Sequence, residues 1–384
     1  MSKKGTAAPK KAVNVGIVGT KFMGRAHSNA FINVGYYFNL TAPPVMRAAC
    51  GVNENDLDAF CRRFGWQTRE TSWEKLVARD DIDLVDIVTP NFLHKPIAIA
   101  AAKKGKHIIC EKPIAMNADE ARAMLEAAQD ANVRHMTAFN YRRVPAVAFA
   151  KRLIDEGKIG RVYHFNAVYY QDWLCDPKFP IVWRHDVTQG GSGAHGDMNA
   201  HIIDLARYLV GEFEAVCCAQ EIFIKERPLK AGKGTGKVTA DDSAYIMARF
   251  QNGALGSFLV SRLATGRKNF LRFELFGSEG AVNFNLERLN ELEYYSTKDH
   301  GPEQGFRTII LTESKHPYID RWWPPGHIIG WEHTFIHEIG DMLLAIENGE
   351  NVHADFYDGM RCQQVIDAAI KSNETRKWIE IPEV

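Results

Sequence analysis

Long apolar runs, an excess of charge of one sign and paired cysteine motifs are all missing from this sequence. No apolar stretch approaches the length of about 20 residues that a membrane-spanning helix needs. The 47 lysines and arginines balance the 47 aspartates and glutamates, so no footprint for nucleic acid is visible. The seven cysteines include no Cys-x-x-Cys pair, which is typical of a reducing compartment. We therefore expect a soluble cytoplasmic protein that binds neither nucleic acid nor a membrane.

A chain of 384 residues is longer than one hydrophobic core usually supports, and it predicts two domains. Residues 1–12 are basic and lack the apolar segment of a signal peptide, so we predict a disordered tail there. We place a first domain at residues 13–143 and a second at residues 144–384.

Strands and helices alternate through the first domain, which predicts a doubly wound parallel sheet. The expected strands cover residues 13–19, 45–52, 83–89, 108–110 and 133–139. The second domain has many strands and few helices, which favours an α+β domain with a large, mainly antiparallel sheet. Its expected strands are 162–170, 215–224, 244–250, 254–262, 270–276 and 281–284. Two closing helices, about 332–348 and 356–374, could also pack back on the first domain.

The first strand leads into the segment Gly19-Thr20-Lys21-Phe22-Met23-Gly24 at the start of a helix. Gly19 and Gly24 match two of the three glycines of a dinucleotide-binding turn, and Lys21 replaces the other. Lys21 must therefore point away from the phosphates or contact them. The end of the second strand, residues 50–54, carries neither the usual ribose-binding carboxylate nor an arginine for a 2′-phosphate. We expect NAD over NADP, with NADP not excluded.

The sequence Glu111-Lys112-Pro113 ends a short buried strand. Ligands of open α/β sheets bind beyond the carboxyl ends of the strands, where Lys112 could reach both a cofactor and a substrate. Pro113 fixes its own φ and so restricts the turn. The alternative is a surface turn with a solvated ion pair.

Asp197 and His201 lie four residues apart at the start of a predicted helix, residues 197–210, after a flexible lead-in over residues 190–196. Their side chains can meet at one point, and the helix dipole favours an ionised Asp197 and a neutral His201. Such a pair suits proton transfer to or from a hydroxyl. The alternatives are an N-terminal cap with a core histidine, or a metal site completed by His195. We predict no metal, because no further residue nearby has ligand spacing. The pair His333 and His337 lacks the zinc motif His-Glu-x-x-His and is interpreted as surface or interface residues.

Four segments, taken in order and spacing, resemble the glucose–fructose oxidoreductase / inositol dehydrogenase (Gfo/Idh/MocA) family. They are GIVGTKFMGRAH, TPNFLH, GKHIICEKP and GSGAHGDMNAHIIDL. Within that family, segments such as AFNYRRVPA and QDWLCDP are similar to bacterial sugar dehydrogenases of the levoglucosan dehydrogenase type. The resemblance implies a Rossmann domain, a second domain that often mediates oligomers (here a homodimer or homotetramer), and an active site between the two.

The resemblance also implies roles for individual residues. Lys112, Asp197 and His201 form the expected catalytic set. The expected cofactor-binding residues are Gly19, Lys21, Phe22, Met23, Asn53, Thr89, Pro90, Asn91, His94, Glu111 and Arg142. Tyr170, Trp173 and Arg184 are candidates for sugar contacts beside the catalytic set, since rings stack on the C–H faces of sugars. Packing in the core is the alternative role for each aromatic residue, including Trp322 and Trp323.

Three functions remain open at this point. The first is NAD-dependent oxidation of a secondary ring hydroxyl of a neutral sugar, anhydrosugar or polyol, with C3 favoured. The second is a hydrolase or lyase that retains its nicotinamide and cleaves a glycosidic bond by transient oxidation and elimination. The third is a non-catalytic sensor of a sugar or dinucleotide, which the presence of a base beside a lysine disfavours.

Overall fold

The computed structural model describes residues 12–230 and 232–383, so the predicted tail lies outside the described residues except for Ala12. The first domain contains a six-stranded parallel sheet with the order β3-β2-β1-β4-β5-β6, the arrangement of a doubly wound dinucleotide-binding fold. Its strands are β1 (Asn14–Val18), β2 (Val45–Cys50), β3 (Thr68–Glu70), β4 (Leu84–Ile87), β5 (His107–Cys110) and β6 (His135–Thr137).

Helices cover both faces of this sheet, and its central strands β1 and β4 are accordingly buried along their whole length. One face packs against α1 (Phe22–Tyr37) and α2 (Glu54–Phe64). The other face packs against α3 (Trp73–Ala78), α4 (His94–Lys103) and α5 (Ala118–Asp130). The predicted fold class of the first domain is confirmed.

The second domain is built on a nine-stranded sheet in which only the pair β7–β12 is parallel. Its order is β16-β15-β14-β13-β7-β12-β11-β8-β17. The strands are β7 (Val162–Tyr170), β8 (Phe213–Glu221), β11 (Ser243–Phe250), β12 (Leu255–Ser261), β13 (Phe270–Gly277), β14 (Gly280–Asn285), β15 (Glu291–Ser296), β16 (Arg307–Ile310) and β17 (Ile379–Glu380). The predicted mainly antiparallel sheet is confirmed, although β15, β16 and β17 were not anticipated.

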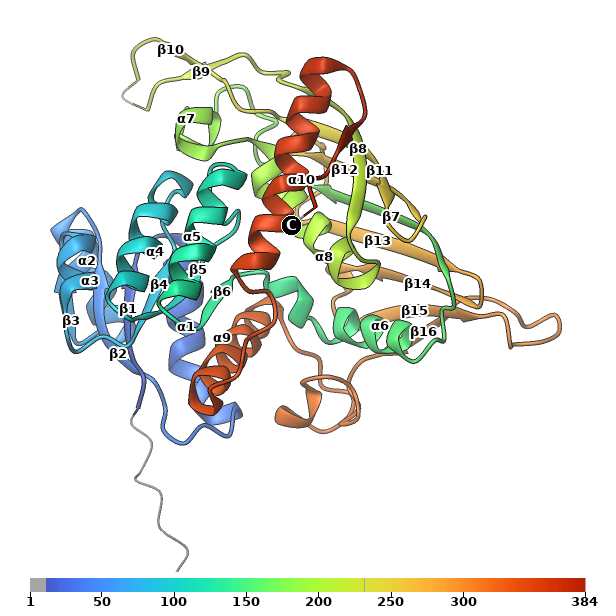
Figure 1. Ribbon diagram of the computed structural model, residues 1–384, viewed down its shortest axis with the longest axis horizontal. Coiled ribbons are helices and arrows are strands. Elements are labelled where there is room, and N and C mark those ends of the chain that lie inside the picture. The colour runs from blue at the N-terminus through green and yellow to red at the C-terminus, as the bar shows by residue number, and fades with distance from the viewer. Residues whose placement is uncertain (1–11, 231, 384) are drawn as a thin grey trace, which may run out of the picture.

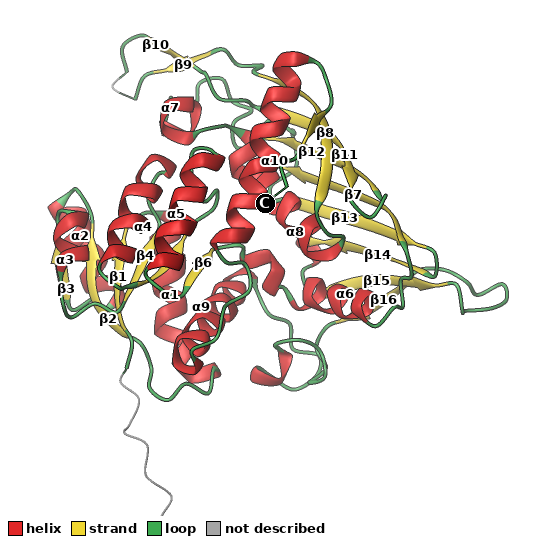
Figure 2. Cartoon of the chain, viewed as in Figure 1, coloured by secondary structure: helices red, strands yellow, loops and turns green. Residues whose placement is uncertain are grey.

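Helices cover only one side of this sheet, as Figure 2 shows. The covering helices are α6 (Pro145–Asp155), α8 (Ala200–Leu209) and α10 (Phe356–Thr375), which share one apolar core with the inward side chains of the strands. Side chains alternate along β11, so Tyr245 and Met247 point outward and are more than half exposed, at 52% and 56%. The smaller helix α7 (Val187–Gly190) and the hairpin of β9 (Glu226–Pro228) and β10 (Thr235–Lys237) lie at one end.

The two closing helices join the domains, and in Figure 1 they lie between the two sheets. Helix α9 (Trp331–Asn348) supplies Phe335, Ile339 and Leu343 to the core of the first domain, against α1. Helix α10 packs against both α5 and β8. Among the described residues, no helix is long and apolar enough to cross a bilayer.

His337 corrects one interpretation of the sequence, because it lies in the core and not on a helix surface. Its Nδ1 atom donates to the carbonyl of Arg143 at 2.9 Å, and its Nε2 atom accepts from the indole of Trp322 at 2.7 Å. Both ring nitrogens therefore have partners, and burial keeps the pKa of His337 at about 3. The same contact holds Trp322, which packs against the apolar core, its alternative role.

The cofactor contact predicted for Arg142 is a second interpretation that the structure corrects. Arg142 is buried in an ion-pair network and is not placed to meet a cofactor. Its guanidinium donates to Asp204 at 2.5 and 2.8 Å and to Asp358 at 3.0 Å. Asp204 belongs to α8 and Asp358 to α10, so Arg142 links the end of the first domain to two helices of the second.

We predict that Arg142→Met destabilises the fold without changing the affinity for NAD. Removing one partner of a buried ion pair leaves uncompensated charge and costs about 3–5 kcal/mol. Arg62→Met is the control, because the Arg62–Asp58 pair lies on the surface, where such pairs contribute about 1 kcal/mol or less. Unfolding in guanidinium chloride measures the free energy of unfolding, and a titration measures the affinity for NAD. Weaker NAD binding by a folded Arg142→Met enzyme would show that Arg142 does contribute to cofactor binding.

Candidate active site

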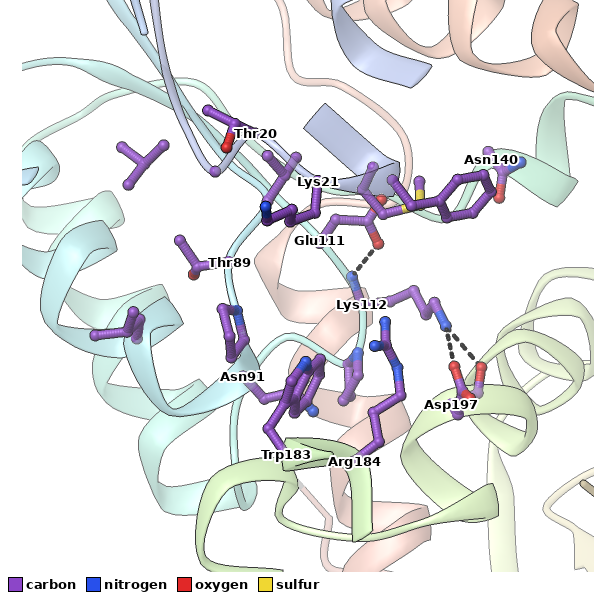
Figure 3. A pocket seen from close by; sticks show the side chains of 18 of the residues that line it. Thr20, Lys21, Thr89, Asn91, Glu111, Lys112, Asn140, Trp183, Arg184 and Asp197 are labelled. Carbon is purple, nitrogen blue, oxygen red and sulfur yellow. Dashed lines mark hydrogen bonds and ion pairs between the residues drawn. The ribbon is translucent and has the colours of Figure 1, made fainter. Parts of the chain in front are cut away.

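A cavity of about 900 Å³ runs along the carboxyl ends of β1, β4 and β5 and continues into the second domain. Figure 3 shows side chains of both domains around it, with dashed lines joining Lys112 to Asp197. Its first-domain end is lined by the glycine-containing turn and its second-domain end by Asp197 and His201. One continuous space therefore connects the predicted cofactor site with the predicted catalytic residues.

The glycine-containing turn has the geometry that a dinucleotide needs. Gly19 has φ +119° and lies so close to Val88 that an added Cβ would approach its carbonyl to 2.5 Å. The 16-residue helix α1 begins directly afterwards with no side-chain cap, so its first N–H groups are free to bind phosphate. The sequence left open whether Lys21 points away from the phosphates or contacts them. Its ammonium is turned outward and pairs with Asp56 at 2.7 Å. The turn thus accommodates a pyrophosphate despite the missing second glycine.

The adenosine end of the cavity is lined by residues of two loops, without a carboxylate on β2. A Cβ at Gly51, directly after β2, would lie 3.1 Å from the Thr20 methyl group, so a side chain there would require Thr20 to shift. The carboxylate at this end comes instead from Glu74, which the hydroxyl of Ser72 contacts at 2.5 Å. No arginine lines this end within the described residues. The arrangement suits NAD, whose ribose carries no 2′-phosphate.

Lys112 extends from the end of β5 across the cavity to the second domain. Its Nζ atom donates to the backbone carbonyl of Asp197 at 2.6 Å and lies 3.5 Å from the Asp197 carboxylate. Its backbone N–H donates to the Glu111 carboxylate at 3.0 Å. The side chain is only 14% exposed. This excludes the alternative of a solvated surface turn.

Asp197 lies in a π-helical segment, His195–Asn199, that continues as α8, a distortion frequent at functional sites. The preceding loop is not the flexible lead-in expected from its glycines. The Asp241 carboxylate accepts from the N–H groups of Gly193 and His195 at 2.6 and 3.0 Å. A Cβ at Gly193 would collide with the backbone of Asp241. Gly193 therefore serves close packing, and Asp241 holds the loop by two hydrogen bonds.

The Asp197 carboxylate lies between two cations, one from each domain. Lys112 approaches one oxygen, and Nε of the fully buried Arg262 lies 3.3 Å from the other. Partial burial alone would raise the pKa of Asp197, but the positive charges of Arg262 and Lys112 outweigh it and hold the pKa below its usual range. Asp197 is therefore ionised at neutral pH. No pattern in the sequence indicated Arg262, which lies 65 positions after Asp197 along the chain.

His201 is buried against the ring of Tyr141, with ring centroids 4.5 Å apart. Burial and the charge of Lys112 lower the pKa of His201 well below its usual value, while Asp197 acts in the opposite direction. Nδ1 is buried without a hydrogen-bond partner. His201 is therefore a neutral imidazole that lines the cavity, and a ring nitrogen can accept a proton there.

A polar network that the sequence analysis missed lines the wall beside His201. The hydroxyls of Tyr141 and Tyr169 lie 3.1 Å apart, and the amide oxygen of Asn269 accepts from Tyr169 at 2.7 Å and from Gln171 at 2.8 Å. All four residues line the cavity. Tyr141 belongs to η2 (Asn140–Arg143) and Tyr169 to β7, whereas Gln171 follows β7 and Asn269 precedes β13, so tertiary packing assembles the network from separate segments.

Most of the predicted site residues do meet at the cavity. Those that line it are Gly19, Lys21, Phe22, Met23, Thr89, Pro90, Asn91, Glu111, Lys112, Arg184, Asp197 and His201. Asn91 also joins the domains, since its side chain donates to the carbonyl of Gly190 at 2.8 Å.

Four further predicted contacts lie outside the cavity, besides Arg142. Asn53 caps α2 by accepting from the N–H of Asp56. His94 is buried between the carbonyls of Thr89 and Pro113, at 3.0 Å from each. Tyr170 points to the opposite face of β7 from Tyr169, because successive strand residues alternate. Trp173 lies behind the wall and donates to Gln171 at 2.9 Å.

No metal site is formed by the residues that the structure describes. His195, the third member of the alternative metal set, is engaged elsewhere: its ring nitrogens contact Gln220 and Asn199, each at 3.0 Å.

The fold and this cavity define a dinucleotide-dependent oxidoreductase. The family described as an NAD-binding Rossmann-fold oxidoreductase family, GFO/IDH/MocA, matches residues 13–139, and the GFO/IDH/MocA C-terminal domain matches residues 147–283. The chain belongs to the Gfo/Idh/MocA family, as its motifs predicted.

Two curated relatives and one solved structure show how close the similarity is. The levoglucosan dehydrogenase of Pseudarthrobacter phenanthrenivorans is 44% identical over 97% of this chain and 99% of its own length. A structure of levoglucosan dehydrogenase with NADH and levoglucosan has a TM-score of 0.94 and 44% identity, covering 97% of this chain and all of that one. The inositol 2-dehydrogenase of Rhizobium meliloti is 26% identical over 96% of this chain and 99% of its own length.

We predict that Lys112→Met raises the pKa of His201 towards its usual value near 6.5, because it removes a neighbouring positive charge. Lys95→Met is the control, since Lys95 lies outside the cavity beside Glu120. NMR titration of the ring, assigned through His201→Gln, measures the pKa. A His201 pKa at or above 6.5 in the unaltered enzyme, or one indifferent to Lys112, would contradict this electrostatic account.

Proposed function

We propose that this protein is an NAD-dependent dehydrogenase that oxidises a secondary ring hydroxyl of a neutral sugar, anhydrosugar or polyol, with C3 the favoured carbon. One observation carries the proposal: an ammonium, a neutral imidazole and an ionised carboxylate converge in a cavity that continues to the dinucleotide turn. The levoglucosan complex of a relative and the identity to it over nearly the whole chain support the substrate class.

The residues of the first domain would hold the cofactor. The free N–H groups at the start of α1 would bind the pyrophosphate, and Thr89, Pro90, Asn91 and Glu111 line the continuation of the cavity. NAD, when bound, supplies the acceptor for the hydrogen that leaves the ring carbon with its electron pair.

His201 acts as the general base. As the carbon–hydrogen bond breaks, the hydroxyl proton passes to Nε2 of His201, so the carbon becomes a carbonyl and the imidazole becomes imidazolium. The low pKa of His201 ensures that the base is free at neutral pH. The Tyr141–Tyr169 hydroxyl pair lies beside the ring.

Lys112 stabilises the oxygen on which negative charge develops. An ammonium has three donors, and two of them face Asp197 in the described structure, which leaves the third for the reacting oxygen. Asp197, ionised and fixed between Lys112 and Arg262, accepts a hydrogen bond from a neighbouring hydroxyl and so orients the ring.

The charges around the cavity favour a neutral substrate. Four cations line the cavity among the described residues. Lys21 pairs with Asp56, and Lys112 and Arg262 pair with Asp197, so Arg184 alone makes no ion pair with a carboxylate of the described chain. It lies over the ring of Trp183, 4.3 Å from its centroid. A phosphate would need a cluster of cations, whereas a guanidinium and a ring suit hydroxyls and C–H faces.

The predicted homodimer or homotetramer remains a proposal. The uncovered face of the nine-stranded sheet supports it, with exposed Tyr245, Met247 and Leu255 on adjacent strands.

We predict that Lys112→Met folds normally and loses turnover by a factor of about 10² or more, because charge stabilisation in the transition state disappears. Lys95→Met is again the matched control. Initial rates of NADH formation and thermal melts provide the measurement. Near-normal turnover with only a raised KM would reduce Lys112 to a binding residue.

We further predict that levoglucosan, glucose or myo-inositol is oxidised with a kcat/KM at least about tenfold higher than that of glucose 6-phosphate, which corresponds to about 1.4 kcal/mol. Rates with NAD, followed by product analysis of the best substrate, provide the measurement. A preference for the phosphosugar would overturn the neutral-substrate assignment. Cleaved product without net NADH would instead establish the elimination mechanism.

A further inference from the structure

His27, on α1, lies directly behind the cavity between two strand ends. Its Nδ1 atom is 2.9 Å from the carboxylate of Asp86 on β4, and its Nε2 atom is 3.1 Å from the carboxylate of Glu111 at the end of β5. The side chains of His27 and Asp86 are completely buried, and that of Glu111 is 7% exposed. Neither the cofactor turn nor the catalytic set accounts for this histidine.

Two ionised carboxylates at these distances favour a doubly protonated ring, although burial and the charge of Glu111 raise the pKa of Asp86. An ionised carboxylate can only accept hydrogen bonds, so each ring nitrogen facing one must carry a proton. Burial alone would lower the pKa of His27, but the charges and hydrogen bonds of Asp86 and Glu111 outweigh it and raise the pKa well above its usual value. His27 is therefore an imidazolium that bridges two carboxylates.

The remaining charged groups of this cluster come from α9 and from the end of the first domain. Glu338 is fully buried, its two carboxylate oxygens make no hydrogen bond, and its nearest cation is Arg143, at 3.6 Å. Burial raises the pKa of Glu338 to about 8, against the attraction of Arg143 and His27. Glu338 is thus mostly protonated at neutral pH, and His27 is the cation in contact with both Asp86 and Glu111, whose two negative charges it compensates in part.

Glu111 connects His27 to Lys112. One of its oxygens contacts His27, and the other accepts from the backbone N–H of Lys112 at 3.0 Å. The Glu111 N–H is fixed to the carbonyl of Ile87 at 2.9 Å. A continuous series of contacts therefore runs from Asp86 through His27, Glu111 and Lys112 to Asp197.

We propose that His27 is a positioning residue of the reaction: it fixes the Glu111 carboxylate and, through it, the peptide from which Lys112 reaches the substrate. The inference rests on the proposed role of Lys112. It differs from a purely structural role, because a structural histidine would contribute to stability without acting on turnover through Glu111.

A double-mutant cycle between His27→Gln and Glu111→Gln tests the inference. Each single variant should lower kcat about tenfold, because a small misplacement of a catalytic group is costly. If His27 acts through Glu111, the double variant should also lose only about tenfold. The KM for the sugar should change less than kcat in all three enzymes. A double variant that loses about a hundredfold, the product of the single effects, would overturn the proposal.

His337→Gln is the matched control, since His337 is equally buried and also makes two hydrogen bonds, but lies outside the cavity. It should lower the melting temperature and leave kcat unchanged. If Lys112→Met keeps its turnover, the proposed function itself fails. If Lys112→Met is inactive and the cycle is additive, only the inference about His27 fails.

Should His27→Gln not fold, spectra of the unaltered enzyme with ¹⁵N-labelled histidine decide the question. At pH 8 one histidine should carry protons on both ring nitrogens, and its pKa should fall in Glu111→Gln. Spectra in which no histidine is doubly protonated at pH 8 would overturn the proposal.

Discussion

The carboxylate of Asp197 is the point on which the arrangement of this enzyme depends. A partly buried anion is unfavourable unless cations compensate it, and here the two cations come from different directions. Lys112 reaches it from β5 of the first domain, and Arg262 from the end of β12 in the second. Arg262 also donates to the carbonyls of Gly193 and Arg184, so the same guanidinium holds the loop that carries Asp197. This electrostatic junction is therefore one of the contacts that hold the two sides of the cleft together.

The same charges determine the chemistry of the site. Lys112 and Arg262 keep Asp197 ionised, and Lys112 together with burial keeps His201 neutral. In the proposed mechanism, the site thus holds a free base, a hydrogen-bond donor and a fixed acceptor before any substrate binds. Preorganisation of this kind lowers the reorganisation that the reaction would otherwise require. Lys112 thus contributes to two effects, and its backbone N–H donates to the Glu111 carboxylate.

The sequence predicted the parts of this structure that local patterns determine. Alternating strands and helices indicated the Rossmann domain, and a strand end indicated Lys112. Asp197 and His201 were found because they are four residues apart on one segment. Residues that tertiary packing assembles were missed: Arg262, Gln171 and Asn269 belong to separate strands or loops and carry no shared motif. Tyr170 was chosen in place of Tyr169, a one-residue error that moves a side chain to the other face of the strand. The glycines at residues 190–196 indicated flexibility, whereas Gly193 is needed for close contact with Asp241. Sequence alone also left the direction of Lys21 open, since only its pairing with Asp56 decides it.

The most direct test of this account follows the hydrogen on the ring carbon. The enzyme would be supplied with NAD and levoglucosan deuterated at C3, and the reduced cofactor would be analysed by mass spectrometry. The account predicts that the deuterium appears in the NADH and that the rate is lower than with unlabelled sugar. Unlabelled NADH formed from the deuterated sugar would contradict oxidation at C3, and the absence of any NADH with every neutral sugar would contradict the dehydrogenase itself.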